Sequence, residues 1–111
     1  MRVIEILKKI KKSDVLISPR VRKKIENKEL SVDEVLDKIF SFDDLKIEAK
    51  QNGSYELIYN YTGKYNLVVI LFVNSNVRLA TAWKSSKSME KLIKKATHIY
   101  DYKRKIDLDN K

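Results

Sequence analysis

The side chains best suited to hold a phosphate group lie near residue 80. Arg78, Lys84 and Lys87 occur along one strand-like segment and just beyond it, close to serines at positions 85, 86 and 88. An arginine held by a strand offers phosphate oxygens a rigid pair of donors, and neighbouring lysines add mobile charge. The pattern predicts a phosphate-binding site around Arg78. A polar strand end followed by an ordinary helix cap would show the same residue types, and this alternative stays open.

Proton transfer could involve His98 or Tyr102, which lie further towards the C-terminus. We expect both on the polar face of a final helix, together with Lys91, Lys94 and Lys95. A lone exposed histidine among lysines is more often a surface residue than a catalyst, because a general base needs a positioned partner. The predicted catalytic candidates are Arg78, Lys84, His98 and Tyr102.

Composition excludes several other kinds of site. The 111 residues include no cysteine and one histidine, which rules out a disulfide framework, a thiol nucleophile, a Cys-ligated zinc ion and a multi-histidine metal site. The two glycines, Gly53 and Gly63, stand in turns and do not form a phosphate-binding loop. We therefore expect no metal and no cofactor, and apart from the single histidine any chemistry must come from Lys, Arg, Tyr, Asp or Glu.

Positive charge is concentrated at the two ends of the chain, and the formal net charge is +9. Residues 1–30 carry ten Lys/Arg and four Asp/Glu, residues 84–111 carry nine and four, and the middle carries five and seven. Two cationic segments in one compact domain favour a polyanionic partner, with nucleic acid as the main candidate. The alternative is a lysine-rich composition unrelated to any ligand. The predicted phosphate contacts are Arg20, Arg22, Lys23, Lys24, Lys87, Lys91, Lys94 and Lys95.

These side chains must be positioned by helices at both ends of the chain and by strands between them. Apolar residues recur with helical spacing over 3–10, Ser18 and Pro19 begin a second helix, and Ser31 with Glu34 forms a capping box for a third. From residue 45 the spacing becomes that of strands, followed by a return to helical spacing from Ser88 to about residue 106. The predicted strands lie near 45–50, 55–61, 65–73 and 77–84.

The order of these elements predicts an α+β fold with N-terminal helices, a four-stranded antiparallel β-meander and a C-terminal helix. Residues 1–106 are expected to form a single domain, followed by a polar C-terminal tail over 107–111. No apolar run approaches the roughly 20 residues needed to cross a bilayer, and charges interrupt the N-terminus where a signal peptide needs an apolar stretch. We therefore expect a cytoplasmic protein that does not contact membranes.

Alternation within the strands predicts the side of the sheet that each residue takes. Tyr55, Tyr59 and Tyr61 share one side with Leu57, a pattern more typical of core packing than of a platform for stacked bases. The third strand is apolar on both sides and should be central.

For the fourth strand, strict alternation places Arg78 on the same side as Ala82 and on the side opposite Trp83. Small neighbours would leave the guanidinium free to reach a phosphate. The rival role for Arg78 is a salt bridge across the sheet to Glu48 or Glu56, which would contribute about 0–1 kcal/mol if exposed.

Two stretches resemble sequences of a known family. The first contains Ser18-Pro19-Arg20, Lys24, Ile25, Lys28, Leu30-Ser31 and Glu34-Val35, and the second runs from Val77 to Ser86 and continues to Glu90. Both resemble the BrnT-type ribonuclease toxins and a related, uncharacterised domain family, and more distantly the RelE-like toxins. Together they cover about residues 18–90.

The chain departs from this family at several motif positions. Arg20 stands in place of the family's histidine, Lys24 and Lys28 replace arginines, and Trp83 stands where the second arginine of the strand would be. Arg78 is kept.

The resemblance implies a small RNA-directed domain, so we expect RNA in preference to DNA. It also implies an acidic or amphipathic, antitoxin-like protein partner. As a metal-independent endoribonuclease it would use Arg78 and Lys84 on the phosphate, with His98 or Tyr102 transferring protons. If the replaced histidine and arginine are required for cleavage, the protein binds RNA without cutting it. Two alternatives are a nucleic-acid-binding module without catalysis and a protein-interaction domain whose positive charge is incidental.

Overall fold

The computed structural model describes residues 2–51, 53–92, 96 and 98–108. Its helical elements are α1 (Val3–Leu7), η1 (Lys12–Asp14), α2 (Pro19–Glu26), α3 (Val32–Ile39), η2 (Phe42–Asp44) and α4 (Met89–Leu92). Its strands are β1 (Leu45–Gln51), β2 (Ser54–Asn60), β3 (Asn66–Val73), β4 (Val77–Ser85), β5 (His98–Asp101) and β6 (Ile106–Asp107). None of the helices among these described residues is long and apolar enough to cross a membrane.

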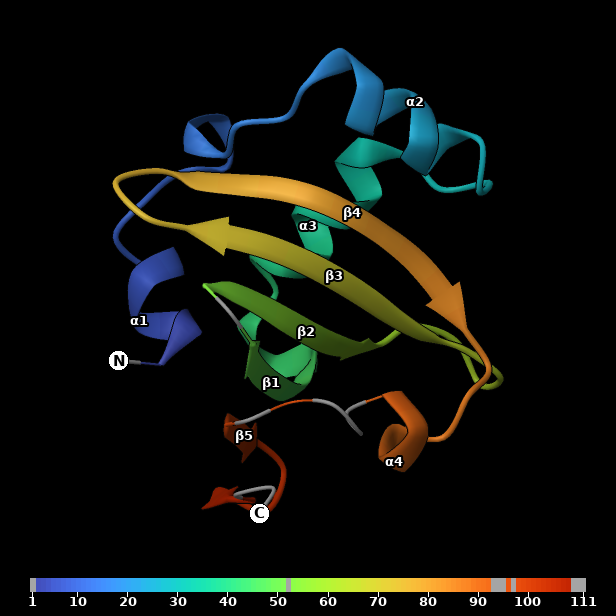
Figure 1. Ribbon diagram of the computed structural model, residues 1–111. Helices are drawn as coiled ribbons and strands as arrows, with labels where there is room; N and C mark the ends of the chain where they lie inside the picture. Colours follow the sequence, from blue (N-terminus) through green and yellow to red (C-terminus); the bar gives the residue numbers. More distant parts are fainter. Residues whose placement is uncertain (1, 52, 93–95, 97, 109–111) are drawn as a thin grey trace.

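The strands form one sheet in the order β4-β3-β2-β1-β5-β6, and every neighbouring pair is antiparallel (Figure 1). The α+β class is confirmed, but the prediction of a four-stranded meander followed by a C-terminal helix is wrong. After β4 the chain forms the short helix α4 and then returns as β5 along the outer edge of β1. A strand satisfies the backbone hydrogen-bonding groups on that edge, which a helix could not do.

The apolar residues that predicted a final helix instead pack against the sheet around the returning strand β5. Ile99 of β5 and Ala96 pack with Ile47, Ala49 and Ile58 on one face of the sheet. Leu92 of α4 and Leu108 lie against the same cluster. The predicted tail begins within β6, and residues 109–111 lie outside the described residues.

Helices α2 and α3 begin where their capping residues predict. The hydroxyl oxygen of Ser18 accepts a hydrogen bond from the Val21 N–H at 3.2 Å, and that of Ser31 accepts one from the Glu34 N–H at 3.0 Å. The Glu34 carboxyl group does not complete the predicted capping box, because it accepts the hydroxyl of Tyr61 at 3.1 Å instead.

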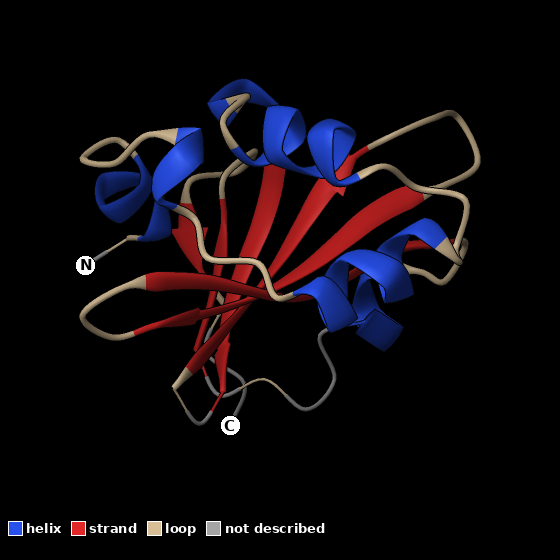
Figure 2. Cartoon of the chain, turned by 90° about the horizontal axis from the view of Figure 1, so that it is seen from above, coloured by secondary structure: helices blue, strands red, loops and turns tan. Residues whose placement is uncertain are grey.

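The main core lies between the helices and one side of the sheet, which we call the covered face. Side chains from α1, α2 and α3 pack there against Leu57, Val69 and Leu79. Tyr55 and Tyr59 are buried in the same core, so their predicted packing role is confirmed. Figure 2 shows the twisted sheet with helices arranged around it.

A β-bulge in β4 changes the alternation near Arg78. Ile70 pairs with Thr81 while Leu71 pairs with Leu79, which leaves Ala80 as an extra residue on β4. Because of the extra residue, every later side chain of β4 lies on the side opposite to the one that strict alternation predicts. The prediction for Arg78 is therefore wrong: it shares a face with Trp83, whereas Ala82 is buried on the covered face.

Only part of the face opposite the helical core is covered. Leu92, Ala96 and Leu108 pack over β1 and β2, and Val68 of β3 is also buried, but several outward residues of β3 and β4 remain accessible to solvent. Phe72 is 43% exposed, Arg78 is exposed, and the other three are partly buried. We call this surface the β3–β4 platform, made of Ile70, Phe72, Arg78, Thr81 and Trp83.

Candidate nucleic-acid interface

The four predicted catalytic residues lie at two separate places in the sheet. Arg78 and Lys84 belong to β4, whereas His98 begins β5 and Tyr102 follows its end. Three strands separate β4 from β5, which corresponds to about 19 Å at the usual strand spacing. A proton-transfer group must lie within hydrogen-bond reach of the reacting atom or one water away. The arrangement thus does not bring these residues together as one catalytic group.

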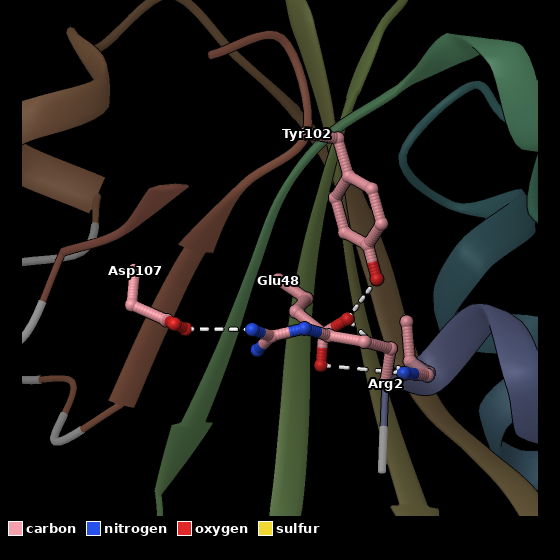
Figure 3. Close-up of polar contacts among 5 residues, drawn as sticks. Arg2, Glu48, Tyr102 and Asp107 are labelled. Atoms are coloured by element: carbon pink, nitrogen blue, oxygen red, sulfur yellow. Dashed lines mark hydrogen bonds and ion pairs between the residues drawn. The ribbon is translucent and has the colours of Figure 1, made fainter. Parts of the chain in front are cut away.

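Tyr102 takes part in a buried polar cluster around Glu48 (Figure 3). Its hydroxyl donates to Oε1 of Glu48, a residue that is only 3% exposed. The Val3 N–H also donates to the Glu48 carboxyl oxygens, at 3.0 and 3.3 Å. Burial, together with the hydrogen bond to Glu48, raises the pKa of Tyr102. The phenol is therefore engaged in holding β1, the N-terminal helix and the C-terminal segment together.

Arg2 closes the outer side of this cluster. Its guanidinium bonds Oδ1 of Asp107 at 2.7 Å (Figure 3). The guanidinium also lies 3.6 Å from the ring centre of Tyr100. Tyr59 is the exception nearby, since its buried hydroxyl has no hydrogen-bond partner within the described structure. Burial and the proximity of Glu48 raise the pKa of this tyrosine.

His98 does not lie on a helix, because the segment that contains it is β5. It is exposed at the start of that strand and pairs in the ladder with Lys50. The predicted helical face shared by His98, Tyr102 and Lys91 is therefore wrong. Lys94 and Lys95, predicted on the same face, lie outside the described residues.

The predicted cations of the N-terminal segment lie near β4, at the end of the sheet opposite to β5. Helix α2 packs against β4 and lies next to it in Figure 1. Residues 16–28 carry five cationic and one acidic side chain, and residues 77–87 carry three and none. We call the exposed cationic side chains of the helix the α2 basic surface: Arg20, Arg22, Lys23 and Lys24.

Lys28 connects the end of α2 with the β3–β4 platform. Its ammonium group donates to the Thr81 hydroxyl at 3.2 Å and lies 5.8 Å from the ring centre of Trp83. Lys84 lies 5.8 Å from the ring centre of Tyr65, near the end of β4. Two further predicted contacts, Lys87 and Lys91, are exposed beyond that strand.

Arg78 lies at the junction between α2 and β4. Leu16 forms a parallel β-bridge with the outer edge of β4 at Arg78. Its N–H donates to the Val77 carbonyl oxygen at 2.9 Å, and its carbonyl oxygen accepts from the Leu79 N–H at 3.0 Å. The opening beside this bridge has a volume of about 520 Å³ and is lined by Leu16, Ile17, Ser18, Val21, Phe72, Arg78, Leu79 and Ala80. Its size is within the range of small-ligand pockets, and Arg78 supplies its cationic group.

The rival salt bridge of Arg78 does not form among the residues that the structure describes. Glu48 faces the helical core and is bonded to Val3 and Tyr102. Glu56 is on the second strand from β4, opposite Ile70, and makes no ion pair with Arg78. The guanidinium is therefore available to a ligand.

Two aromatic residues of the platform were not singled out from the sequence. Phe72 lies directly opposite Arg78 in the β3–β4 ladder, and Trp83 lies further along the same face. Phe72 belongs to a continuous apolar run that suggests only a buried strand. Strict alternation puts Arg78 and Trp83 on opposite faces, so the sequence does not show that the bulge brings them to one face. Only the paired strands show that cationic and aromatic side chains meet here.

Comparisons with protein-family models, curated proteins and solved structures give no significant match. The resemblance to BrnT-type toxins and the antitoxin-like partner that it implies remain predictions. The candidate interface therefore rests on the position of its own residues.

Proposed function

We propose that this protein binds single-stranded RNA on the β3–β4 platform and the α2 basic surface. The observation that carries the proposal is the bulge at Ala80, which places Arg78 on the same face as Phe72 and Trp83. A partly open sheet face with aromatic side chains and adjacent cations suits unpaired bases and their phosphates. The charge of the surface is complementary to such a strand, with eight cationic residues and one acidic residue over 16–28 and 77–87.

The platform favours a single strand over a duplex. Stacking of one base on an aromatic side chain contributes about 1–3 kcal/mol, and it requires a base that is not enclosed in a helix. Phe72 has an exposed ring and lies opposite Arg78 in the β3–β4 ladder. A base on Phe72 would thus bring its own phosphate close to a cation. The preference for RNA over DNA rests on the resemblance to ribonuclease toxins.

Cleavage is not part of this proposal. Arg78 and Lys84 are four strand spacings from His98, and Tyr102 is hydrogen-bonded within the Glu48 cluster. We therefore propose binding without a chemical step.

The test is the salt dependence of binding to a fluorescent single-stranded RNA of about ten nucleotides, a length that one small domain can cover. The logarithm of affinity should fall linearly with the logarithm of salt, by about 0.7 per phosphate contact. Arg78→Ala should weaken binding at least about tenfold, or about 1.4 kcal/mol, with little change in thermal stability. Lys103→Ala, an exposed lysine beyond β5, is the matched control and should retain the affinity.

A slope near zero would leave the positive charge without a role in RNA binding and overturn the proposal. Equal losses in Arg78→Ala and Lys103→Ala would show that binding is not centred on the platform. DNA and duplex RNA of the same sequence test the preference for single-stranded RNA, which predicts weaker binding of both.

A further inference from the structure

Glu56 is an acidic residue beside the basic platform. It lies on β2 and pairs with Ile70, which in turn pairs with Thr81. Ser54, two residues earlier, pairs with Phe72. Glu56 is thus a diagonal neighbour of Phe72, at about 7–8 Å between backbone positions. Among the described residues of β2, β3 and β4, no other carboxyl group occupies this face.

The fold does not use the Glu56 carboxyl group. It is partly buried, and within the described part of the chain it has neither a hydrogen bond nor an ion pair. Burial raises its pKa, as expected for a carboxyl group that loses water without gaining a donor. Glu48, on the other face, is also withdrawn from water but accepts from Val3 and Tyr102. Glu56 therefore has its acceptor capacity available for a ligand.

On the basis of the proposed function, we propose that Glu56 makes the platform selective for guanine. The base would stack on Phe72, and the Glu56 carboxylate would accept hydrogen bonds from guanine N1–H and from its N2 amino group. A carboxylate is acceptor-only and has two oxygens, so it matches two adjacent donors. Bases in a single strand leave this edge free for a protein.

The other bases match a carboxylate less well. Adenine and cytosine each present one amino group next to an acceptor nitrogen, and uracil presents one N–H between two carbonyl oxygens. In each case a carboxylate oxygen would face another acceptor, which is unfavourable in a partly desolvated site. The same negative charge repels phosphates, so Glu56 should lower affinity for strands that lack guanine.

The experiment compares oligouridines of about ten nucleotides that carry one central guanine, adenine, cytosine or uracil. The full chain should bind the guanine strand about tenfold more tightly than the uracil strand, as expected for a good bidentate contact. Replacing guanine with inosine, which lacks the N2 amino group, should remove much of this preference. This measurement uses the unaltered protein and does not depend on any variant folding.

Glu56→Gln should then reduce the guanine preference to within about twofold while raising the affinity for plain oligouridine. The control is Glu26→Gln, which removes an exposed carboxylate from α2. It makes the same change in charge near the basic surface and should raise all affinities equally without changing the preference. A loss of the guanine preference in Glu56→Gln alone would separate base recognition from general electrostatics.

The outcomes distinguish the two proposals. If no oligonucleotide binds in a salt-dependent way, the proposed function fails and the inference about Glu56 fails with it. If all strands bind equally, or if Glu56→Gln keeps the guanine preference, Glu56 does not select the base, although the platform still binds RNA. Equal affinity for the guanine and inosine strands would exclude the contact with the N2 amino group.

Discussion

Charged side chains are used differently at the two ends of the sheet. Around β1 and β5 they are paired: Glu48 accepts from Val3 and Tyr102, and Arg2 bonds Asp107. Around α2 and β4, no ion pair involves any of the cationic side chains Arg20, Arg22, Lys23, Lys24 and Arg78 within the described residues. The first group holds segments of the chain together, whereas the second is free to bind an anion.

The basic end is held in place by contacts other than charge. Ile25 of α2 is fully buried in the core, and Leu16 is bonded to the backbone of β4. Like charges on α2 repel one another and lower the stability of the compact state. Binding of a polyanion to this unpaired charge is therefore expected to increase the stability of the folded protein. Substitutions at the two ends should therefore affect different properties, stability at one and binding at the other.

The largest effect should follow Glu48→Ala. The substitution leaves the Val3 N–H and the Tyr102 hydroxyl in a buried site without their acceptor. Each unsatisfied group costs about 1–3 kcal/mol, so we expect a loss of about 3 kcal/mol in the free energy of unfolding. Urea denaturation measures this loss.

Glu48→Gln provides the graded comparison, because one acceptor oxygen remains. It should lose about half as much stability, and neither folded variant should change in RNA affinity. A strong loss of RNA binding by folded Glu48→Gln would contradict the division between the two ends.

A smaller free-energy effect is expected for Lys23→Glu combined with Lys24→Glu on the α2 basic surface. Affinity for single-stranded RNA should fall at least about tenfold, or about 1.4 kcal/mol, and the salt slope should shrink by about 1.4 because two contacts are lost. Unfolding free energy should change by no more than about 0.5 kcal/mol, since both side chains are exposed.

The matched control is Lys103→Glu combined with Lys105→Glu, which makes the same change in charge at exposed positions after β5. It should leave most of the affinity intact. Equal losses in the two double variants would mean that net charge, and not its location, governs binding.

Asp101→Asn should have a moderate effect on stability, with a defined dependence on pH. Burial alone would raise the pKa of Asp101, but donors from Arg104 and Lys103 outweigh it and hold the pKa below its usual value. The stabilisation is thus present above about pH 4 and is lost as pH falls through the lower pKa of the folded state. Denaturation at pH 7 should show a loss of about 1 kcal/mol, and a difference that persisted unchanged to pH 2 would contradict this account.

The smallest effect is expected for Glu56→Gln, and it has the opposite sign. Because burial raises the Glu56 pKa, the charged form is disfavoured in the folded state at neutral pH. The variant should be more stable than the original protein at pH 7, by up to about 0.5 kcal/mol. This gain should disappear as pH falls through the raised pKa towards the unfolded value. A stability loss at pH 7 would show that Glu56 has a structural partner.

Local features of the fold could be predicted from the sequence because they depend on a few neighbouring residues. Ser18 and Ser31 cap their helices by bonding N–H groups three positions later. Alternation correctly placed Tyr55 and Tyr59 in the core, since no bulge interrupts that part of β2. The residue types along 18–28 and 77–87 likewise predicted the basic helix α2 and indicated Arg78 as a phosphate-binding candidate.

The tertiary structure decided what depends on the pairing of distant segments. Residues 98–101 form a strand because they pair with the edge of β1, about fifty positions away in the chain. Local spacing alone predicted a helix there. The face of Arg78 was set by the extra residue at Ala80, which appears only when β4 is aligned with β3. Residue types and local spacing thus determined the helix caps, the buried tyrosines and the distribution of charge. Backbone hydrogen bonding between strands placed Arg78 with Phe72 and Trp83, set Glu56 beside them, and kept His98 and Tyr102 at the other end of the sheet.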